Sequence, residues 1–467
     1  MFDDFEQNLK IGGDDFDNPD LRSLLEDILA SVKRGRIVVT SRYPVTELSN
    51  YLSRIEINPL SHAETRKLFL RLPRIGEQTG ADLSALLTQI GGHPRLLEFL
   101  DAILSRGKGR IGHITKRLGE LKQDLKIGQN LRIENLDQAL QLALQIGERD
   151  IFLEELVALA DEQGLSEVLF QLGVSNLPVS VLGLTRMLGS ESVDHSEITS
   201  ILTRLTDLSL IHILPDRTAF THRWTASGLA RLRGSERHSQ DCVQAAEYRM
   251  WKFNQDHDLA DLEEGIRNFL AASELVRATE IALRCVDIYK ALNRTRSIAL
   301  LGSEVLEKIG PEIPGYINLA GAEADAHFTI GSTDRSLSRY TDLTRLLEVR
   351  CTAKPDRADF QRDLSVSYDR MGDIYRALGE GEKARQAFLQ SLQISERLAT
   401  AEPDRADYRI DLSLSLIRVG LVSGAEGRRA IEMAREILVE LDLAGRLPLS
   451  DKPKIEAIES ILSQLEG

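Results

Sequence analysis

Few residues in this chain have the type and spacing to do chemistry. Two adjacent carboxylates, Asp3 and Asp4, follow a pair of apolar residues, Arg42 ends a short apolar run, and His222 follows another. Carboxylates, arginine and histidine are residue types that form catalytic and binding sites. Each is also common at turns and strand ends, so the surrounding elements must decide which of these residues have a function.

Several catalytic motifs are missing from the sequence. The phosphate-binding string Gly-x-x-x-x-Gly-Lys-Ser/Thr does not occur, and neither does a Ser-His-Asp order, a metal motif or a Gly-x-Ser-x-Gly elbow. Residues 107–112 satisfy Gly-x-Gly-x-x-Gly. That fingerprint indicates a dinucleotide site only after a strand. Here it follows a helical segment, so we interpret it as a flexible basic loop.

The elements that must position the N-terminal candidates are a mixture of helix and strand. Asn18-Pro19 before regularly spaced leucines predicts a helix that starts at Pro19. Residues 36–42 predict a short buried strand that ends at Arg42. Ser61 and Glu64 predict a capping box at the start of another helix. Pro94 follows Gly-Gly-His and separates two further helices.

A second group of elements lies between residues 165 and 232. The pattern predicts one helix near 177–182, a second at 198–208, and a two-stranded ribbon made by 210–214 and 218–221. Two helices followed by such a ribbon indicate a winged helix. His222 comes directly after its second strand.

The order of these elements resembles the nucleotide-binding region of the STAND class of signalling ATPases, whose best-known branch is NB-ARC. The resemblance covers about residues 1–235. It implies that Asp3 and Asp4 end a Walker B strand, where Asp3 holds magnesium through water and Asp4 polarises the attacking water. Phosphoryl transfer depends on positioning and charge stabilisation. Without a phosphate-binding loop and its lysine, we expect no appreciable ATPase activity from this chain alone.

The same resemblance assigns three further residues to nucleotide binding. It implies that Arg42 contacts the γ-phosphate, that Pro94 packs against the nucleotide, and that His222 contacts the β-phosphate of ADP. Arg223 stands where the family has aspartate. An intact relative would use ADP or ATP with magnesium as its cofactor.

The C-terminal third contains an internal repeat. Residues 353–372 and 401–420 share 12 of 20 positions, and the period between Pro355 and Pro403 is 403 − 355 = 48. Self-similarity at a fixed period of this size indicates stacked supersecondary units. An older copy is indicated one period earlier, because Gly331 lies 48 residues before Gly379.

The residue types in each copy resemble tetratricopeptide repeats. Gly372 is small enough for the first helix of a pair to approach the second closely, and small and large residues alternate along the second helix. We expect a helix at about 450–465 to cap the stack. The residues expected to pack the repeats are Tyr368, Gly372, Tyr375, Ala384, Phe388, Ser391 and Gly420.

These predictions describe a mainly α protein with a residual α/β part, a helical domain, a winged helix and an α-solenoid of tetratricopeptide-like repeats. We expect five parts: the C-terminal part of an α/β nucleotide-binding domain at 1–57, a helical domain at 58–125, helices leading into a winged helix at 126–235, a helical connecting arm at 236–318, and repeats with a capping helix at 319–467.

Charge and cysteine content narrow the partners and the compartment. The net charge is 58 − 72 = −14, so nucleic acid is not an expected partner of the whole molecule, although residues 106–126 form a basic cluster. Three distant cysteines favour a reducing, cytoplasmic compartment. No apolar run reaches the roughly 18 residues of a membrane span.

Three functions from different classes remain open. The first is a fragment of a STAND-type switch whose repeats sense a protein or peptide, with homo-oligomerisation possible in an intact relative. The second is a stand-alone repeat scaffold without nucleotide function. The third is a winged-helix DNA binder, which is disfavoured because helix 196–208 carries only Arg204 against Glu197 and Asp207.

Overall fold

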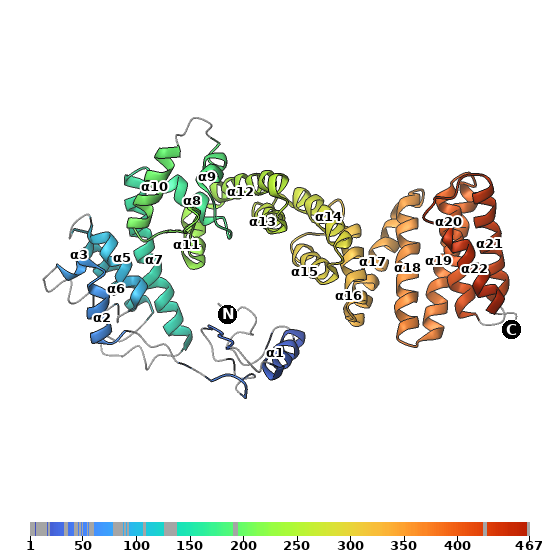
Figure 1. The fold of residues 1–467 in the computed structure, drawn as a ribbon, viewed down its shortest axis with the longest axis horizontal. Coiled ribbons are helices and arrows are strands. Elements are labelled where there is room, and N and C mark those ends of the chain that lie inside the picture. Colours follow the sequence, from blue (N-terminus) through green and yellow to red (C-terminus); the bar gives the residue numbers. More distant parts are fainter. Residues whose placement is uncertain are drawn as a thin grey trace. The chain divides into compact units, whose positions relative to one another are not determined.

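The computed structural model spans residues 1–467 and divides into two compact units, 1–149 and 150–467. Each unit is mainly helical (Figure 1). The structure describes all residues except 1–4, 6–15, 17–18, 32–35, 42–44, 46–47, 49, 54, 56–59, 78–86, 88–89, 91–92, 106–108, 126–137, 190–194, 424–426 and 465–467; the side chains of 19–20, 62, 109, 138–146, 148 and 464 are also not described.

The first unit contains short helices whose starts follow the sequence signals. The capping box is confirmed: Ser61 N–H donates to Glu64 Oε2 at 2.8 Å, and Glu64 N–H donates to Ser61 Oγ at 3.3 Å. The predicted start of the first helix at Pro19 is confirmed as well. The helices are α1 (Pro19–Ser31), α2 (His62–Phe69), α3 (Pro73–Gly76), α5 (Pro94–Leu104), α6 (Gly109–Asp124) and the beginning of α7 (Gln138–Glu162).

Two predictions for this unit differ from the structure. Residues 36–41 form no continuous strand, since only Val39 is in a bridge and Val38 is 52% exposed. A strand becomes regular only where a neighbour accepts and donates its backbone hydrogen bonds. The predicted loop at 107–112 is partly wrong, because Gly109 and Gly112 begin α6. The packing of buried side chains at helical spacing stabilises α6 despite the low helix propensity of its glycines. These side chains are Ile111, Ile114 and Leu118.

The second unit begins with the helices and ribbon predicted for residues 165–232. After the end of α7 come α8 (Ser166–Gly173), α9 (Val181–Met187), α10 (His195–Asp207), β1 (His212–Ile213), β2 (Ala219–Phe220) and α11 (Arg223–Arg233). The two strands are antiparallel, with His212 opposite Phe220. Ala219 also forms a bridge with Val179, just before α9. The order of the elements is the expected one, but the helix expected near 177–182 starts only at Val181, because Ser180 Oγ caps it by accepting from the N–H of Gly183 and Val179 pairs with Ala219. The assignment as a winged helix stays a prediction.

The rest of the second unit is a series of helices in which each packs against the next (Figure 1). We call this series the array. Its members are α12 (Ser235–Asp256), α13 (Leu259–Ala271), α14 (Leu275–Ala291), α15 (Thr295–Leu306), α16 (Tyr316–Thr329), α17 (Thr333–Ala353), α18 (Ala358–Ala377), α19 (Gly381–Ala401), α20 (Ala406–Val422), α21 (Arg428–Leu443) and α22 (Pro453–Gln464). The tetratricopeptide-like solenoid expected from the sequence is therefore present.

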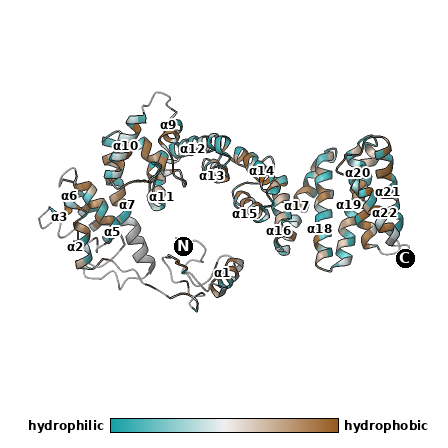
Figure 2. Ribbon diagram, viewed as in Figure 1, coloured by the Kyte–Doolittle hydropathy of each residue, from teal (hydrophilic) through white to brown (hydrophobic). Residues whose placement is uncertain are grey.

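The array has a continuous apolar interior. One cluster of buried residues runs from Phe253 in α12 to Ile374 in α18, so it crosses the boundary predicted at 318/319. Apolar and polar residues alternate along the helices of the array (Figure 2). The last helix, α22, matches the predicted cap, because its Ile458 is buried in a second cluster with Ile431 and Leu438.

Glycine permits close approach inside each repeat. A Cβ at Gly372 would lie 2.4 Å from Phe388 Cε1, and a Cβ at Gly420 would lie 2.4 Å from Ile431 Cγ1. The turn after α18 uses Gly379 at φ +77°, and the turn after α16 uses Gly331 at φ +87°. Both torsions lie in the left-handed region that favours glycine. The older copy indicated one period earlier thus has the same turn geometry.

Candidate functional site

The residues assigned by resemblance to nucleotide binding are only partly described. Asp3, Asp4 and Arg42 lie outside the described residues. Pro94 is exposed at the first position of α5, in the first unit. His222 is exposed at the N-cap of α11, in the second unit. A nucleotide or magnesium site that combines these residues therefore stays a prediction.

His93, next to Pro94, is held in its neutral form. Its Nε2 lies 3.0 Å from Nη2 of Arg149, a group that can only donate, so Nε2 must accept. Burial lowers the pKa of His93, and the charge of Arg149 lowers it further. The start of α5 is thus fixed by a neutral histidine.

Buried polar contacts tie the segment before α9 to the start of the array. Arg249 is 1% exposed; its Nη1 donates to Asp261 Oδ1 at 2.8 Å and its Nη2 donates to the carbonyl of Leu177 at 2.6 Å. Glu264 accepts from the backbone N–H of Asn176 at 2.6 Å. Buried charges persist only when they are paired in this way. The contacts therefore fix the position of residues 176–177 against α12 and α13.

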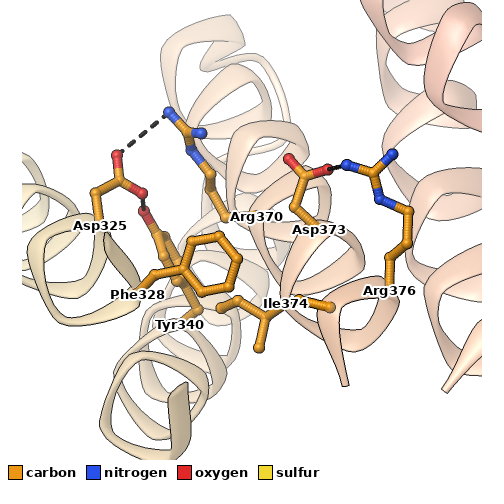
Figure 3. Close-up of a pocket in the computed structure, with 8 residues that line it drawn as sticks. Asp325, Phe328, Tyr340, Arg370, Asp373, Ile374 and Arg376 are labelled. Atoms are coloured by element: carbon orange, nitrogen blue, oxygen red, sulfur yellow. Dashed lines mark hydrogen bonds and ion pairs between the residues drawn. The ribbon is translucent and has the colours of Figure 1, made fainter. Parts of the chain in front are cut away.

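Two adjoining cavities lie among α14, α16, α17 and α18, and together we call them the array groove. Their volumes are about 380 and 480 Å³, and they share Asp325, Tyr340 and Arg370. The smaller is also lined by Phe328, Asp373, Ile374, Arg376 and Ala377 (Figure 3). The larger is also lined by Leu283, Val286, Asp287, Lys290, Ile317, Asn318, Gly321, Ala322, Leu343, Asp363, Val366 and Ser367.

A polar trio joins the two cavities. Arg370 Nη2 lies 3.2 Å from Asp325 Oδ2, and the hydroxyl of Tyr340 donates to Asp325 Oδ1 at 2.6 Å, so Asp325 is held from two helices (Figure 3). Burial and the charge of Asp325 raise the pKa of Tyr340, which keeps its hydroxyl protonated as a donor. Both charged side chains are still more than 40% exposed. The trio is thus oriented by the fold and open to a ligand.

The ion pair of this trio recurs one repeat later. Asp325 pairs with Arg370, and Asp373 lies 3.6 Å from Arg418; each arginine follows its aspartate by 45 residues (370 − 325 and 418 − 373). Arg418 also pairs with the buried Asp369 at 2.9 Å. These pairs connect α16 to α18 and α18 to α20. Leu421 takes the aspartate position in α20, so this series ends there.

The seven residues predicted to pack the repeats are buried or half-buried in the structure. Gly372 lies against Phe388, and Ser391 Oγ is 3.2 Å from Ser415 Oγ across the α19–α20 contact. The polar residues of the array groove were not predicted. One signal was available in the sequence. Arg370 and Arg418 lie 48 residues apart, and so do Asp325 and Asp373, so both members of the ion pair repeat with the period.

Other chemistry is weakly represented in the part of the chain that the structure describes. No group of three or more His, Cys, Asp or Glu side chains there could hold a metal ion, and no helix there is long and apolar enough to cross a membrane. Burial raises the pKa of the Cys242 thiol to about 12 and that of Cys285 to about 11. Such thiols stay protonated and are poor nucleophiles.

Arg204, the basic residue of the second helix in the predicted winged helix, has a partner in the protein. Its Nη2 donates to Gln163 Oε1 at 2.9 Å. The exposed side of α10 otherwise carries mainly serine and threonine beside Glu197 and Asp207. This surface has no excess of positive charge for binding a phosphate backbone.

Comparisons with known proteins find similar solved structures but no matching family. No protein-family model matches the sequence, and no curated protein matches it. One similar solved structure is the Signal Transduction ATPase with Numerous Domains (STAND) protein with a tetratricopeptide repeat sensor PH0952 from Pyrococcus horikoshii, which is 12% identical over 95% of this chain and 74% of that chain, with a TM-score of 0.36. The MamA protein is 16% identical over 44% of this chain and 98% of that chain, with a TM-score of 0.25.

Proposed function

We propose that the array binds a segment of a partner protein in the array groove. The observation that carries this proposal is the pair of adjoining cavities, which combine the exposed apolar side chain of Val366 with the oriented charges of Asp325 and Arg370. Stacked helical repeats expose an extended surface of this kind to their ligands.

The charges of the groove suit a peptide better than a reacting small molecule. An exposed ion pair such as Asp325–Arg370 contributes only about 0–1 kcal/mol to stability, so a ligand can replace either partner at little cost. Cavities of about 380 and 480 Å³ each have room for one or two side chains. Among the described lining residues, the hydroxyl of Tyr340 has a carboxylate beside it, but burial and that charge raise the pKa of Tyr340 and keep the hydroxyl protonated. Binding is therefore the function that this geometry supports best.

Filling the groove tests the proposal. A random peptide library would be selected on the full chain, and the selected peptides would be measured on two variants with the same substitution. Val366→Trp places a large ring at the groove, whereas Val349→Trp alters another exposed valine, at 64% exposure, which lines neither cavity. We expect Val366→Trp to weaken binding by at least about tenfold. Equal binding by both variants, or no selected binder, would refute the proposal.

A nucleotide-dependent switch in residues 1–235 is our second candidate. The observation that favours it is the exposed His222 at the N-cap of α11, an 11-residue helix whose first backbone N–H groups favour an anion. If ADP binds there, ADP with magnesium should raise the melting temperature of the chain, and His222→Ala should abolish the rise. A shift that is unchanged in His222→Ala would show that the nucleotide does not depend on His222, and no shift in the wild type would favour the scaffold.

The switch candidate includes a prediction about hydrolysis. We infer that this chain alone has no appreciable ATPase activity, because its sequence holds no phosphate-binding loop and lysine to position magnesium-ATP. Phosphate release should equal that of an Asp4→Ala variant. Hydrolysis clearly above that variant would show that Asp4 is catalytic here.

A further inference from the structure

One aspartate position is paired with an arginine in the second copy of the repeat and has no such pair, among the described residues, in the first. Asp411 in α20 is held by Arg362 of the preceding pair, with Nε 2.6 Å from Oδ2 and Nη2 3.3 Å from Oδ1. Asp363 in α18 is the same position one period earlier, since 411 − 363 = 48. A two-point contact between guanidinium and carboxylate is the geometry that arginine forms best. The array itself therefore shows which group fits this carboxylate.

The corresponding arginine is missing for Asp363. The residue 48 positions before Arg362 is Pro314, which precedes α16 and has no side-chain donor. No hydrogen bond or ion pair joins the Asp363 carboxylate to a described residue, and the carboxylate lines the larger cavity of the array groove. Burial and the charge of Asp359 raise the pKa of Asp363, and the more distant charges of Arg362 and Arg350 offset this only in part. Both arginines have other partners, Asp411 and the carbonyl of Pro311, so the carboxylate can accept a further cation.

Basic side chains already in the larger cavity have other partners. Arg370 is 3.2 Å from Asp325, and Lys290 is 3.9 Å from Asp287. Among the described charged residues that line the larger cavity, Asp363 is therefore the one without an ion pair. The net charge of −14 adds a field that attracts basic partners.

An apolar position lies one helical turn from Asp363. Val366 is 46% exposed and lines the same cavity with Ile317. Its equivalent one period later, Leu414, packs against the C-terminal apolar cluster (414 − 366 = 48). In the second copy, the carboxylate of Asp411 is paired with an arginine and Leu414 packs against apolar side chains. In the first copy, the carboxylate of Asp363 has no ion pair with a described residue and Val366 is exposed.

We propose that the array groove binds a partner segment that presents an arginine to Asp363 and an aliphatic side chain to Val366. The partner's guanidinium takes the position that Arg362 takes on Asp411. Arginine is preferred to lysine because only its planar fork donates to both carboxylate oxygens. This inference rests on the proposed function and specifies the chemistry of its ligand.

The test uses the full chain and three pools of ten-residue peptides with a neutral polar background. The pools carry a fixed Arg and Leu, a fixed Glu and Leu, or a fixed Arg and Ser. The variants are Asp363→Asn and, as a matched control, Asp411→Asn, where the same change is made one period later. We expect the Arg–Leu pool to bind best, to weaken about 10- to 100-fold on Asp363→Asn, and to bind Asp411→Asn like the wild type. Asp363→Lys should bind the Glu–Leu pool instead.

The outcomes separate this inference from the function on which it rests. Library peptides that need the groove, as shown by Val366→Trp, but carry no enriched arginine would overturn the inference and leave the function standing. Equal binding of the Arg–Leu and Glu–Leu pools, or binding unchanged by Asp363→Asn, would do the same. If no peptide from the library or the pools depends on the groove, both proposals fail.

Discussion

Replacing Gly372 by alanine tests the close packing inside a repeat. An added Cβ would lie 2.4 Å from Cε1, 2.6 Å from Cδ1 and 2.8 Å from Cζ of Phe388. The ring is 1% exposed and cannot swing into solvent. Overpacking a core costs about 1–3 kcal/mol, and contacts this short with a rigid ring favour the upper half of that range. The better helix propensity of alanine returns about 1 kcal/mol.

The expected net loss for Gly372→Ala is therefore about 1–2 kcal/mol, which is roughly a 5- to 30-fold change in the local opening equilibrium. Hydrogen exchange of the full chain, read on the amides of α18 and α19, measures it directly. Gly321→Ala in α16 is the matched control, because an added Cβ there meets no atom within 4 Å. We expect this control to exchange at the wild-type rate or more slowly.

A double variant separates steric overlap from other effects of the substitution. Phe388→Leu removes the ring atoms that an alanine at 372 would touch, so the two substitutions should be strongly non-additive. The packing argument is wrong if Gly372→Ala does not speed exchange in α18 and α19. It is also wrong if the two losses simply add.

Three further predictions concern stability. Arg249→Ala should cost about 3–5 kcal/mol in chemical denaturation, because it removes one partner of a buried pair. Arg345→Ala breaks a pair with 73% and 62% exposed side chains and should cost under about 1 kcal/mol. Similar losses would contradict the role of burial. Burial raises the pKa of Asp369 to about 6, only partly offset by Arg418, so the folded state binds this proton more tightly than the unfolded state. Stability should therefore fall as pH rises from about 4 to about 6, and Asp369→Asn should reduce this slope; an identical slope would disprove it. Gly379→Ala should cost about 1–2 kcal/mol of stability, because the φ of Gly379 is +77°. Gly381→Ala should not destabilise the protein, because an added Cβ there meets nothing within 4 Å. Equal melting temperatures of the two variants would count against backbone strain at Gly379.

The repeats could be predicted because their signals are local. Gly372 and Phe388 are 16 residues apart, and helices of this length with a tight turn bring them together whatever the rest of the chain does. The capping box of Ser61 and Glu64 spans three residues and formed as expected. Patterns of this range depend little on distant packing.

The start of the array was harder to predict, because its turns lack the expected residue type. Gly331 and Gly379 occupy the left-handed turns of the later pairs, but Ser273 (φ +63°) and Asn293 (φ +55°) occupy those of the earlier ones. Asparagine and serine mark such turns less clearly than glycine does. Helices α12 to α15 were therefore predicted as a connecting arm, and that assignment stays a prediction; in the structure each of these helices packs against the next.

The contacts among the groove residues could not be predicted, because these residues meet only after the helices stack. Asp325 and Arg370 are 45 residues apart and come from different pairs. The period fixes which residues are equivalent but not which of them come into contact. The predicted strand at 36–42 has the same cause of error, since strand formation depends on neighbours that the local sequence does not specify.

The series of ion pairs has a consequence for how such an array can grow by duplication. A tandem copy of residues 358–405 inserted before α20 would give Asp373 an arginine and give Arg362 both of its carboxylates, so each ion pair between units would form again. In the inserted unit, the aspartate equivalent to Asp363 would be filled by Arg362 of the unit before it. Only the first unit keeps an unfilled carboxylate, so the array can change its length without changing its binding position.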